Sequence, residues 1–402
     1  MKVLHINSYA KAGGAEQVAC DLLQNPWVDA SLLVKSHDAA DPRIHRFPPH
    51  FTEPGFRFLD RVVWKLGFRN QFKTLLSLSE SFNFTYQKLR QLPVYQEADL
   101  VHLHNLHGNY FDLHALPRIA RDKPLVWTMH DMWPMTGGEF YTYGNQNYQK
   151  GIGQTDIRYL APLQDPLWDR RQHLLELKKR LYAQLQDRLT FVPVSRWLEQ
   201  AFLSAYVYAP GLQVQTIYNG FDPAVFFDQQ QRTWAKPRVL FFHGAGESKN
   251  ASLFRQVLDQ ITAPFDLYVI GQPLEHPARV FYEPYIADRE RLRALYNQVD
   301  VLVFPSKAET FGLMPLEAMA CGVCVIASDA TALPEVVSPS AGYLFASENA
   351  PDLLQKIELA LADLPHTRRL GAQAARQAPT QFPLNQVHRQ YYQLYQSILG
   401  ER

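Results

Sequence analysis

The stretch that most constrains the fold of this chain is residues 301–322. It begins with the continuous apolar run Val301–Phe304, which is typical of a parallel strand covered on both faces. A short polar loop follows. The next segment contains Pro315, a residue suited to the first helical position, and ends at Gly322, a common helix terminator. The stretch therefore predicts a buried strand, a loop and a helix, the repeating unit of a parallel α/β domain.

The loop of this unit carries the features of an anion site. We expect the backbone N–H groups of Phe311, Gly312 and Leu313 to lack helical partners, because they lie at the start of the helix. Free amides at a helix N-terminus attract an anion, usually a phosphate. Glu309 lies on the loop and Glu317 is expected in the first helical turn, and carboxylates accept hydrogen bonds from sugar hydroxyls. This stretch alone therefore suggests a sugar nucleotide.

The length and composition narrow the class of protein. A chain of 402 residues is too long for one ordinary core and predicts two domains. The formal net charge of +1 gives no overall basic field for nucleic acid. No apolar run approaches the ~18 residues of a membrane span, and polar residues come too early for a secretory signal. The three cysteines (Cys20, Cys321 and Cys324) imply a reducing compartment. We expect a cytoplasmic protein with no metal site.

The chain opens with a strand, a glycine loop and a helix. Val3–Asn7 forms the strand, Gly13 and Gly14 lie in the loop, and the helix begins near Ala15. This order is how a doubly wound domain starts, and the two glycines let a ligand approach the backbone. A tight turn without a ligand is the alternative. The dinucleotide pattern of three spaced glycines is absent.

Two later strands of the first half end in histidines. His104 and His130 follow these strands, and the carboxyl ends of strands in open parallel sheets form the ligand-facing edge. His130 is the stronger functional candidate, and a structural role is the alternative for His104. A metal site is disfavoured because no carboxylate or cysteine joins these histidines at helical spacing. The candidate acceptor-binding residues at this edge are His104, Asn105 and Asp131.

Two segments of the first half are irregular. Residues 43–73 hold seven basic and two acidic residues, with aromatic residues among them. The part at 56–73 is either a surface facing an anionic membrane or acceptor, or a helical insertion with a solvated basic face, which we favour. Residues 134–165 lack a periodic pattern and predict a long functional loop. A basic helix is expected at 166–189.

The alternation of short strands and helices restarts in the second half, which predicts a second parallel sheet. We expect one Rossmann-like α/β domain over residues 1–221 and another over 222–383. Residues 384–402 predict a final helix with an apolar, aromatic face.

These residues resemble one family. The chain looks like a two-domain retaining glycosyltransferase of the GT-B fold, in the group called glycosyltransferase family 4. The most specific match is the pair Glu309 and Glu317 within the Val301–Gly322 stretch. The first half adds Gly13-Gly14-Ala15-Glu16 and Asn219-Gly220-Phe221-Asp222. Residues 127–138 are similar to a subgroup that builds surface polysaccharides.

The resemblance implies a mechanism and a set of roles. The family retains anomeric configuration and uses no metal or cofactor. Its donor is a nucleoside-diphosphate sugar, and its acceptor is a hydroxyl on a glycan, a lipid-linked glycan or a small molecule. The first domain should bind the acceptor and the second the donor, across a central cleft, with the C-terminal helix crossing back to the first domain. The implied catalytic residues are His130 and Glu309. The implied donor-binding residues are Gly13, Gly14, Asn219, Gly244, Lys249, Phe311, Gly312, Leu313 and Glu317.

Individual roles follow from the same resemblance. Lys249 should hold the donor diphosphate, Glu317 the ribose and Glu309 the transferred sugar. Gly14 should pack against the donor phosphate, and His130 should accept a sugar hydroxyl beside the anomeric centre. We also expect peripheral contact with the inner face of a membrane if the acceptor is lipid-linked.

Two departures from the family pattern keep other functions open. The loop at 245–249 lacks the arginine that many members carry before the position of Lys249. The loop at 134–165 lacks the cysteines of related subgroup members. The alternatives are a GT-B epimerase or phosphorylase, and a protein that binds a sugar nucleotide without catalysis.

Overall fold

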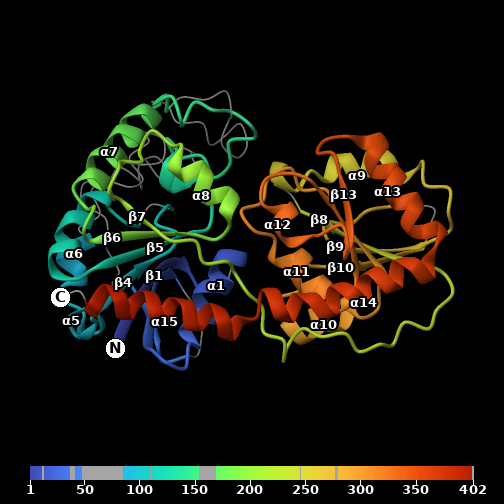
Figure 1. Cartoon of the computed structure of the whole chain (residues 1–402), viewed down its shortest axis with the longest axis horizontal. Coiled ribbons are helices and arrows are strands. Elements are labelled where there is room, and N and C mark those ends of the chain that lie inside the picture. Colours follow the sequence, from blue (N-terminus) through green and yellow to red (C-terminus); the bar gives the residue numbers. More distant parts are fainter. Residues whose placement is uncertain are drawn as a thin grey trace, which may run out of the picture. The chain divides into compact units, whose positions relative to one another are not determined.

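The computed structural model in Figure 1 describes most of the chain. The described residues are 1–10, 13–36, 41–47, 85–108, 110–153, 169–244, 246–276 and 279–400. The chain divides into two compact units. Unit 1 comprises Met1–Val194, Leu198–Ile217 and His388–Arg402, and unit 2 comprises Ser195–Trp197 and Tyr218–Val387. The basic aromatic segment at 56–73 lies outside the described residues.

Unit 1 is built on a parallel sheet. Within the described residues the sheet has seven strands in the order β3-β2-β1-β4-β5-β6-β7, and all neighbours are parallel. The burial of β1 is typical of a parallel sheet. Its six inner residues are all buried, as expected for a strand covered on both faces. The strands are β1 (Lys2–Tyr9), β2 (Asp29–Ser36), β3 (Ile44–Arg46), β4 (Leu100–Leu103), β5 (Leu125–Met129), β6 (Leu189–Pro193) and β7 (Gln213–Val214).

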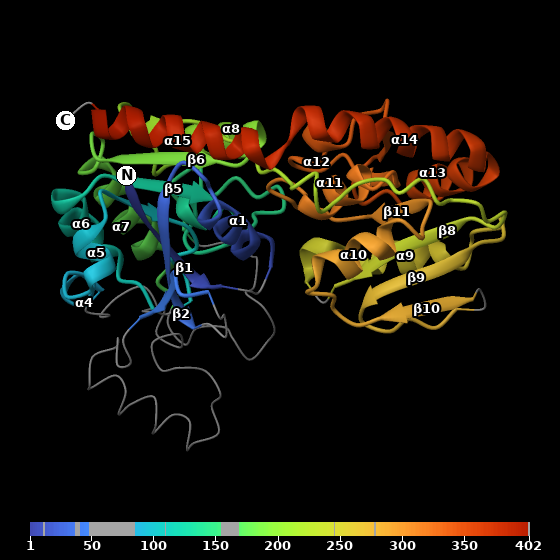
Figure 2. The same cartoon turned by 90° about the horizontal axis from the view of Figure 1, so that it is seen from below.

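Helices connect these strands. They are α1 (Gly14–Leu23), α4 (Thr85–Leu89), α5 (Pro93–Glu97), α6 (Leu116–Asp122), α7 (Arg171–Ala183), α8 (Arg196–Leu203) and the short 3-10 helices η1 (Leu113–Ala115) and η2 (Trp133–Met135). The last helix, α15 (Leu384–Gly400), belongs to unit 1 from His388 onward and runs along one side of the unit 1 sheet in Figure 2. Tyr391 and Tyr395 lie on its buried face, as the aromatic spacing predicts.

Unit 2 contains a second parallel sheet. Within the described residues its six strands follow the order β10-β9-β8-β11-β12-β13. The strands are β8 (Arg238–His243), β9 (Asp266–Gly271), β10 (Val280–Glu283), β11 (Val301–Phe304), β12 (Cys324–Ser328) and β13 (Gly342–Phe345). The helices are α9 (Ala251–Leu258), α10 (Arg289–Tyr296), α11 (Leu313–Ala320), α12 (Leu333–Val336), α13 (Ala350–Ala362), α14 (Leu364–Gln381) and the 3-10 helix η3 (Glu247–Lys249). The prediction of two Rossmann-like parallel-sheet domains is confirmed.

The start of α11 corrects two sequence predictions. The helix begins at Leu313, so Pro315 is its third residue rather than its first, and Glu317 is its fifth residue, beyond the first turn. The physical reason is Gly312, whose φ of 109° turns the chain into the helix two residues earlier. Proline is tolerated at the third position because an N–H there has no helical partner. The predicted helix end at Gly322 is confirmed, with a φ of 80° just after the C-cap Cys321.

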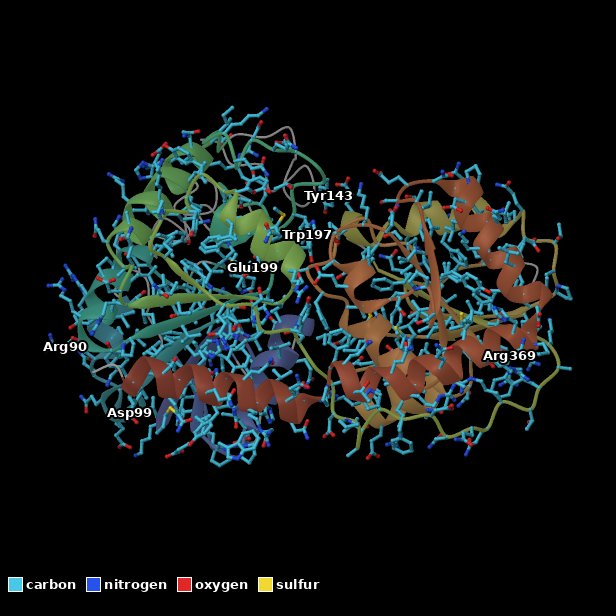
Figure 3. All side chains as sticks on the ribbon, in the orientation of Figure 1. Arg90, Asp99, Tyr143, Trp197, Glu199 and Arg369 are labelled. Atoms are coloured by element: carbon cyan, nitrogen blue, oxygen red, sulfur yellow. The ribbon has the colours of Figure 1, made fainter. Side chains whose placement is uncertain are left out.

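The helix expected at 384–402 is α15. The basic helix expected at 166–189 is α7, but it ends at Ala183 and β6 begins at Leu189, so the predicted end was too late; residues 166–168 lie outside the described part of the chain. The described part of the 134–165 loop holds η2 at its start and no strand. The first two residues of α8 belong to unit 2, where Glu335 accepts hydrogen bonds from the N–H groups of Arg196 (2.9 Å) and Trp197 (2.7 Å). Figure 3 labels Trp197. None of the described helices is long and apolar enough to cross a membrane.

Candidate functional site

The first part of the candidate site is the N-terminus of α11 in unit 2. The first complete helical bond runs from the N–H of Leu316 to the carbonyl of Gly312 (3.2 Å). In the described part of the chain, no acceptor contacts the N–H groups of Phe311, Gly312 or Leu313. The expected cluster of unpaired donors is therefore present, and such a cluster is suited to an anion.

Packing holds this loop in place. Phe311 is 2% exposed and its ring meets that of Phe382 edge-on, with the ring centroids 5.5 Å apart. A Cβ added at Gly312 would lie 3.0 Å from Cδ2 of Leu333, so both its φ and its surroundings favour glycine. The side chain of Thr331 donates to the carbonyl of Glu309 (2.6 Å) and accepts from its N–H (2.8 Å). The loop therefore presents its amides from a fixed backbone.

Lys249 and Glu309 contact each other directly. The Nζ of Lys249 lies 2.5 Å from Oε1 of Glu309, with the lysine side chain 31% and the glutamate side chain 11% exposed. The lysine comes from η3 and its ammonium also lies 5.6 Å from the ring centroid of Phe304. A Cβ at Gly244 would lie 3.1 Å from Cγ of this lysine, so the glycine leaves room for its stem. The sequence suggested separate ligands for these two side chains and did not reveal that they pair.

Glu317 lies near a cation that the sequence analysis missed. It is 7% exposed, and its Oε1 lies 3.9 Å from Nη2 of Arg289 at the start of α10. The guanidinium of Arg289 also lies 5.1 Å from the ring centroid of Phe226. Its place directly after the N-cap Asp288, at a helix start in an α/β domain, is the signal that could have identified it. The candidate site in unit 2 therefore consists of the amides at 311–313, the cations Lys249 and Arg289, and the carboxylates of Glu309 and Glu317.

A cavity of about 610 Å³ lies elsewhere in unit 2. It is lined by Asp228, Arg232 and Gly322 among others, and so faces the C-terminal end of α11. The amides of Phe311, Gly312 and Leu313, which have no acceptor among the described residues, lie at the other end of this helix. Asn219, a predicted donor ligand, is buried in unit 2.

In unit 1 the glycine loop lies at the start of α1. Gly13 is the N-cap and Gly14 the first helical residue. Gly13 accepts from the N–H of Gln17 (3.0 Å) through its carbonyl. The two glycines thus expose a helix start, as the sequence predicts, at the end of β1.

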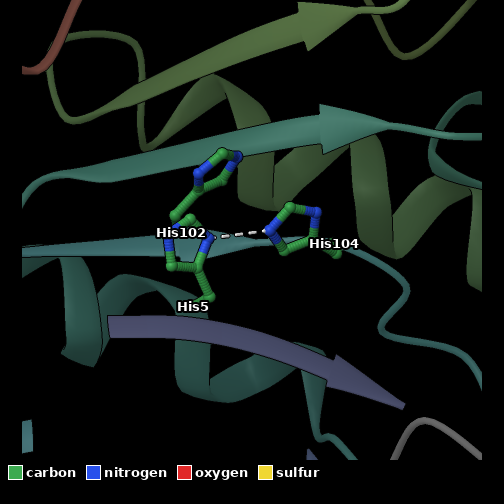
Figure 4. Close-up of side chains that lie close together, drawn as sticks. All are labelled: His5, His102 and His104. Atoms are coloured by element: carbon green, nitrogen blue, oxygen red, sulfur yellow. Dashed lines mark hydrogen bonds between the residues drawn. The ribbon is translucent and has the colours of Figure 1, made fainter. Parts of the chain in front are cut away.

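Four histidines meet in unit 1, two of which the sequence analysis singled out. His104 Nδ1 lies 2.9 Å from His130 Nε2, and His104 Nε2 lies 3.0 Å from His5 Nδ1. His102 stacks on His104 with ring centroids 4.3 Å apart, and Figure 4 shows His5, His102 and His104 together. The register that pairs His5 with His102 across β1 and β4 brings them side by side. His5 and His102 escaped the sequence analysis because they lie inside apolar strands.

Burial controls the charge of this cluster. Desolvation lowers the pKa of His5 to about 3 and that of His130 to about 4, with Asp131 opposing the latter shift. Desolvation, followed by the neighbouring histidines, holds the pKa of His102 and of His104 well below the usual value. All four rings are therefore neutral near pH 7.

The cluster fits hydrogen bonding better than metal binding. Ligand atoms of His5, His102 and His104 lie within 4.8 Å of one another. Both ring nitrogens of His104 already contact other histidines. Those of His102 contact the hydroxyls of Tyr395 (2.6 Å) and Thr128 (2.7 Å). Neither ring has a nitrogen that is uncommitted within the protein.

The loop after His130 is clamped from α7. Lys178 is fully buried; its Nζ donates to the carbonyls of Trp133 (2.5 Å) and Thr136 (3.0 Å) and lies 3.6 Å from the Trp133 ring centroid. Tyr182 donates to the carbonyl of Pro134 (2.9 Å). This clamp was also missed, because a lysine on a basic helix predicts a solvated side chain.

The remaining acceptor candidates lie beside the histidines. Asp131 accepts from the N–H of Trp133 (2.8 Å), and its other oxygen lies 3.3 Å from Nε2 of His107. The N–H of Asn105 donates to Asn7 (3.2 Å). His104 is 1% exposed, so it lies behind His130 rather than at the surface.

Comparison with protein families gives two matches. The model for "Glycosyl transferases group 1" matches residues 227–377, and the model for "Glycosyltransferase Family 4" matches residues 35–225. The two matches lie side by side and together span most of the chain.

Individual proteins agree with these matches. The putative colanic acid biosynthesis glycosyl transferase WcaC of Escherichia coli K12 is 26% identical over 434 residues, which cover 99% of this chain and 100% of that protein. An N,N'-diacetylbacillosaminyl-diphospho-undecaprenol alpha-1,3-N-acetylgalactosaminyltransferase of Campylobacter jejuni is 29% identical over 41% of this chain and 46% of its own length.

Solved structures share the fold. Sucrose-phosphate synthase from Thermosynechococcus elongatus has a TM-score of 0.67 at 19% identity and covers 100% of both chains. Anabaena HepE in complex with UDP and glucose has a TM-score of 0.66 at 18% identity, over 99% of this chain and 100% of its own.

Proposed function

This chain belongs to the group 1 and family 4 glycosyltransferases, enzymes that transfer sugars from nucleotide-sugar donors, and we propose that it does so with retention of anomeric configuration and without a metal ion. The observation that carries the proposal is the set of unpaired amides at Phe311, Gly312 and Leu313, next to the Lys249–Glu309 pair. The amides and Lys249 suit a diphosphate, and the carboxylate of Glu309 suits the hydroxyls of a sugar.

The donor diphosphate is bound by the start of α11 and by Lys249. The leaving nucleoside diphosphate gains negative charge as the glycosidic bond breaks, and fixed amides stabilise that charge without reorganising. Lys249 forms an ion pair with Glu309, with 2.5 Å between Nζ and Oε1. A phosphate that attracts the ammonium leaves Glu309 available to accept hydroxyls of the transferred sugar.

Glu317 binds the ribose hydroxyls. It is 7% exposed on the second turn of α11, and its carboxylate carries acceptor sites beyond those that Arg289 uses at 3.9 Å. The 245–249 loop lacks the arginine that many family members carry, and Arg289 adds a second positive charge to this part of unit 2 beside that of Lys249.

Unit 1 carries its own candidate groups. Gly13 and Gly14 present a helix start that suits an anion, and His130 is our candidate for contact with a sugar hydroxyl. Asn105 and Asp131 remain our candidates for the acceptor. His104 leaves that set, because it is 1% exposed and bonded through both nitrogens.

The acceptor we propose is a lipid-linked glycan. The support is the relative from Campylobacter jejuni, whose name includes a diphospho-undecaprenol acceptor, and the basic aromatic sequence at 56–73. Flotation with vesicles of neutral lipid, with and without added anionic lipid, tests the membrane contact. Salt-sensitive flotation that requires anionic lipid is expected, and no flotation with either vesicle contradicts it.

The transfer assay uses UDP-, GDP- and ADP-sugars with a membrane extract as acceptor source, and product release is followed by mass spectrometry. We expect one donor to give free nucleoside diphosphate and a glycosylated product. The variant Lys249→Met lowers transfer, whereas Lys236→Met, which removes a lysine paired with Asp266 at 2.6 Å, is the matched control. Donor that is epimerised without acceptor supports the epimerase alternative. Donor binding with no turnover under any condition supports the non-catalytic alternative.

A further inference from the structure

Three histidines of unit 1, of which His5 and His104 are buried, form a continuous hydrogen-bonded chain. His5 on β1 contacts His104 at the end of β4 through Nδ1 and Nε2 (3.0 Å). His104 in turn contacts His130 at the end of β5 through Nδ1 and Nε2 (2.9 Å). His5 and His104 are each 1% exposed. The chain thus leads from the interior of the sheet to His130.

A neutral imidazole carries one N–H and one acceptor nitrogen. Each of the two contacts therefore needs one donor and one acceptor. If His104 donates through Nδ1, its Nε2 is an acceptor, so His5 must carry its proton on Nδ1 and His130 on Nδ1 as well. If His104 donates through Nε2, all three carry the proton on Nε2. No arrangement with mixed tautomers satisfies both contacts.

Burial keeps the chain in one of these two neutral arrangements. A charged imidazolium between other rings and away from water is costly, and desolvation lowers the pKa of His5 to about 3. The contacts are also rigid, because the three rings come from strands or strand ends of one sheet. A switch of tautomer in one ring therefore requires a switch in all three.

We propose that His5 and His104 are positioning residues that fix the tautomer of His130. The role of His130 itself rests on the proposed function. Its Nε2 contacts His104, so a sugar hydroxyl that donates to this ring must reach Nδ1. That requires the arrangement in which all three histidines carry the proton on Nε2. His5 is two hydrogen bonds away from His130. The tautomer of His5 is thereby coupled to whether Nδ1 of His130 accepts or donates a hydrogen bond.

His102 provides a matched control within the same cluster. Its ring is fully buried, stacks on His104 with the centroids 4.3 Å apart, and lies tilted beside His5 with the centroids 4.8 Å apart. Its nitrogens contact Tyr395 and Thr128 instead, so it takes no part in the chain. His102→Phe and His5→Phe make the same change at neighbouring buried positions, but only His5→Phe removes a nitrogen from the chain.

The direct test is two-dimensional ¹⁵N NMR of the ring nitrogens in the wild-type protein with labelled histidine, near pH 7. We expect His5, His104 and His130 to be neutral and all protonated on Nε2. Mixed tautomers among the three, or a doubly protonated ring, overturn the proposal. This measurement needs no substrate and no variant, so it is separate from any failure of the proposed function.

The variants test the consequence for His130. In His5→Phe, His104 loses its fixed direction, so His130 is expected to populate both tautomers and to give averaged nitrogen shifts. Transfer is expected to fall about fivefold in kcat, the worth of one hydrogen bond, with KM nearly unchanged. In His102→Phe, the His130 spectrum is expected to stay as in the wild type. Unchanged His130 shifts in His5→Phe, or equal changes in both variants, contradict the proposal.

Discussion

Acidification from pH 8 to pH 5 should destabilise this protein through its buried histidines. His5, His102 and His104 are 1%, 0% and 1% exposed. Desolvation lowers the pKa of each in the folded state, to about 3 for His5. The unfolded chain binds protons at these residues as the pH falls through about 6.5, whereas the folded chain does not. The stabilisation is therefore complete above this pH and is lost as the pH falls toward the folded pKa.

The size of the effect follows from proton linkage. A histidine that remains neutral in the folded state and has an ordinary pKa when unfolded loses about 2 kcal/mol between pH 8 and pH 5. His5, His102 and His104 together give about 6 kcal/mol, and His130, whose pKa is also lowered, adds to this loss. The sum is an upper limit, because the rings interact. Domains are typically stable by about 5–15 kcal/mol, so the loss is a large share of the total.

Urea unfolding followed by far-UV circular dichroism at pH 8, 7, 6 and 5 measures this free energy. His102→Phe removes one of the four rings whose pKa burial lowers, and should flatten the pH dependence by about a quarter. His114→Gln is the control: the bond to Asp112 raises the pKa of exposed His114, so its loss should leave the steep fall intact. A free energy of unfolding that is equal at pH 8 and pH 5 refutes the reasoning.

Three further outcomes follow. Gly312→Ala places a Cβ 3.0 Å from Leu333 at a φ of 109°, and should cost about 1–2 kcal/mol in thermal unfolding and weaken UDP or GDP binding. Unchanged melting contradicts the strain. Lys178→Met leaves two buried carbonyls without their donor, and should cost about 2–4 kcal/mol, whereas Lys179→Met on the same helix should cost less. Transfer in the presence of EDTA should equal transfer without it, and a loss that Mg²⁺ restores contradicts metal independence.

The strands were the most predictable part of the fold. Val301–Phe304 matches β11 residue for residue, because a parallel strand buried on both faces leaves a continuous apolar run. The start of α11 was placed two residues late, because Pro315 is a signal for a helix start and the left-handed turn at Gly312 was not recognised. The proline correctly indicated that a helix begins in this region, but the backbone conformation of Gly312 determines the residue at which it begins.

The histidine cluster shows what sequence cannot resolve. His104 and His130 were recognised because they follow strands. His5 could not be linked to them, since the contact depends on β1 and β4 being neighbours and on their register. The pairing of Lys249 with Glu309, 60 residues apart, depends in the same way on two loops meeting in unit 2.

Isothermal titration of the purified protein with UDP, GDP and ADP tests the central claim most directly, that α11 of unit 2 begins a nucleoside-diphosphate site. We predict that one of them binds the wild type, that Lys249→Met weakens it at least tenfold through loss of a charge-assisted contact, and that Glu317→Gln weakens it too. Lys236→Met should bind as the wild type does. Binding that is unchanged in both Lys249→Met and Glu317→Gln contradicts the account.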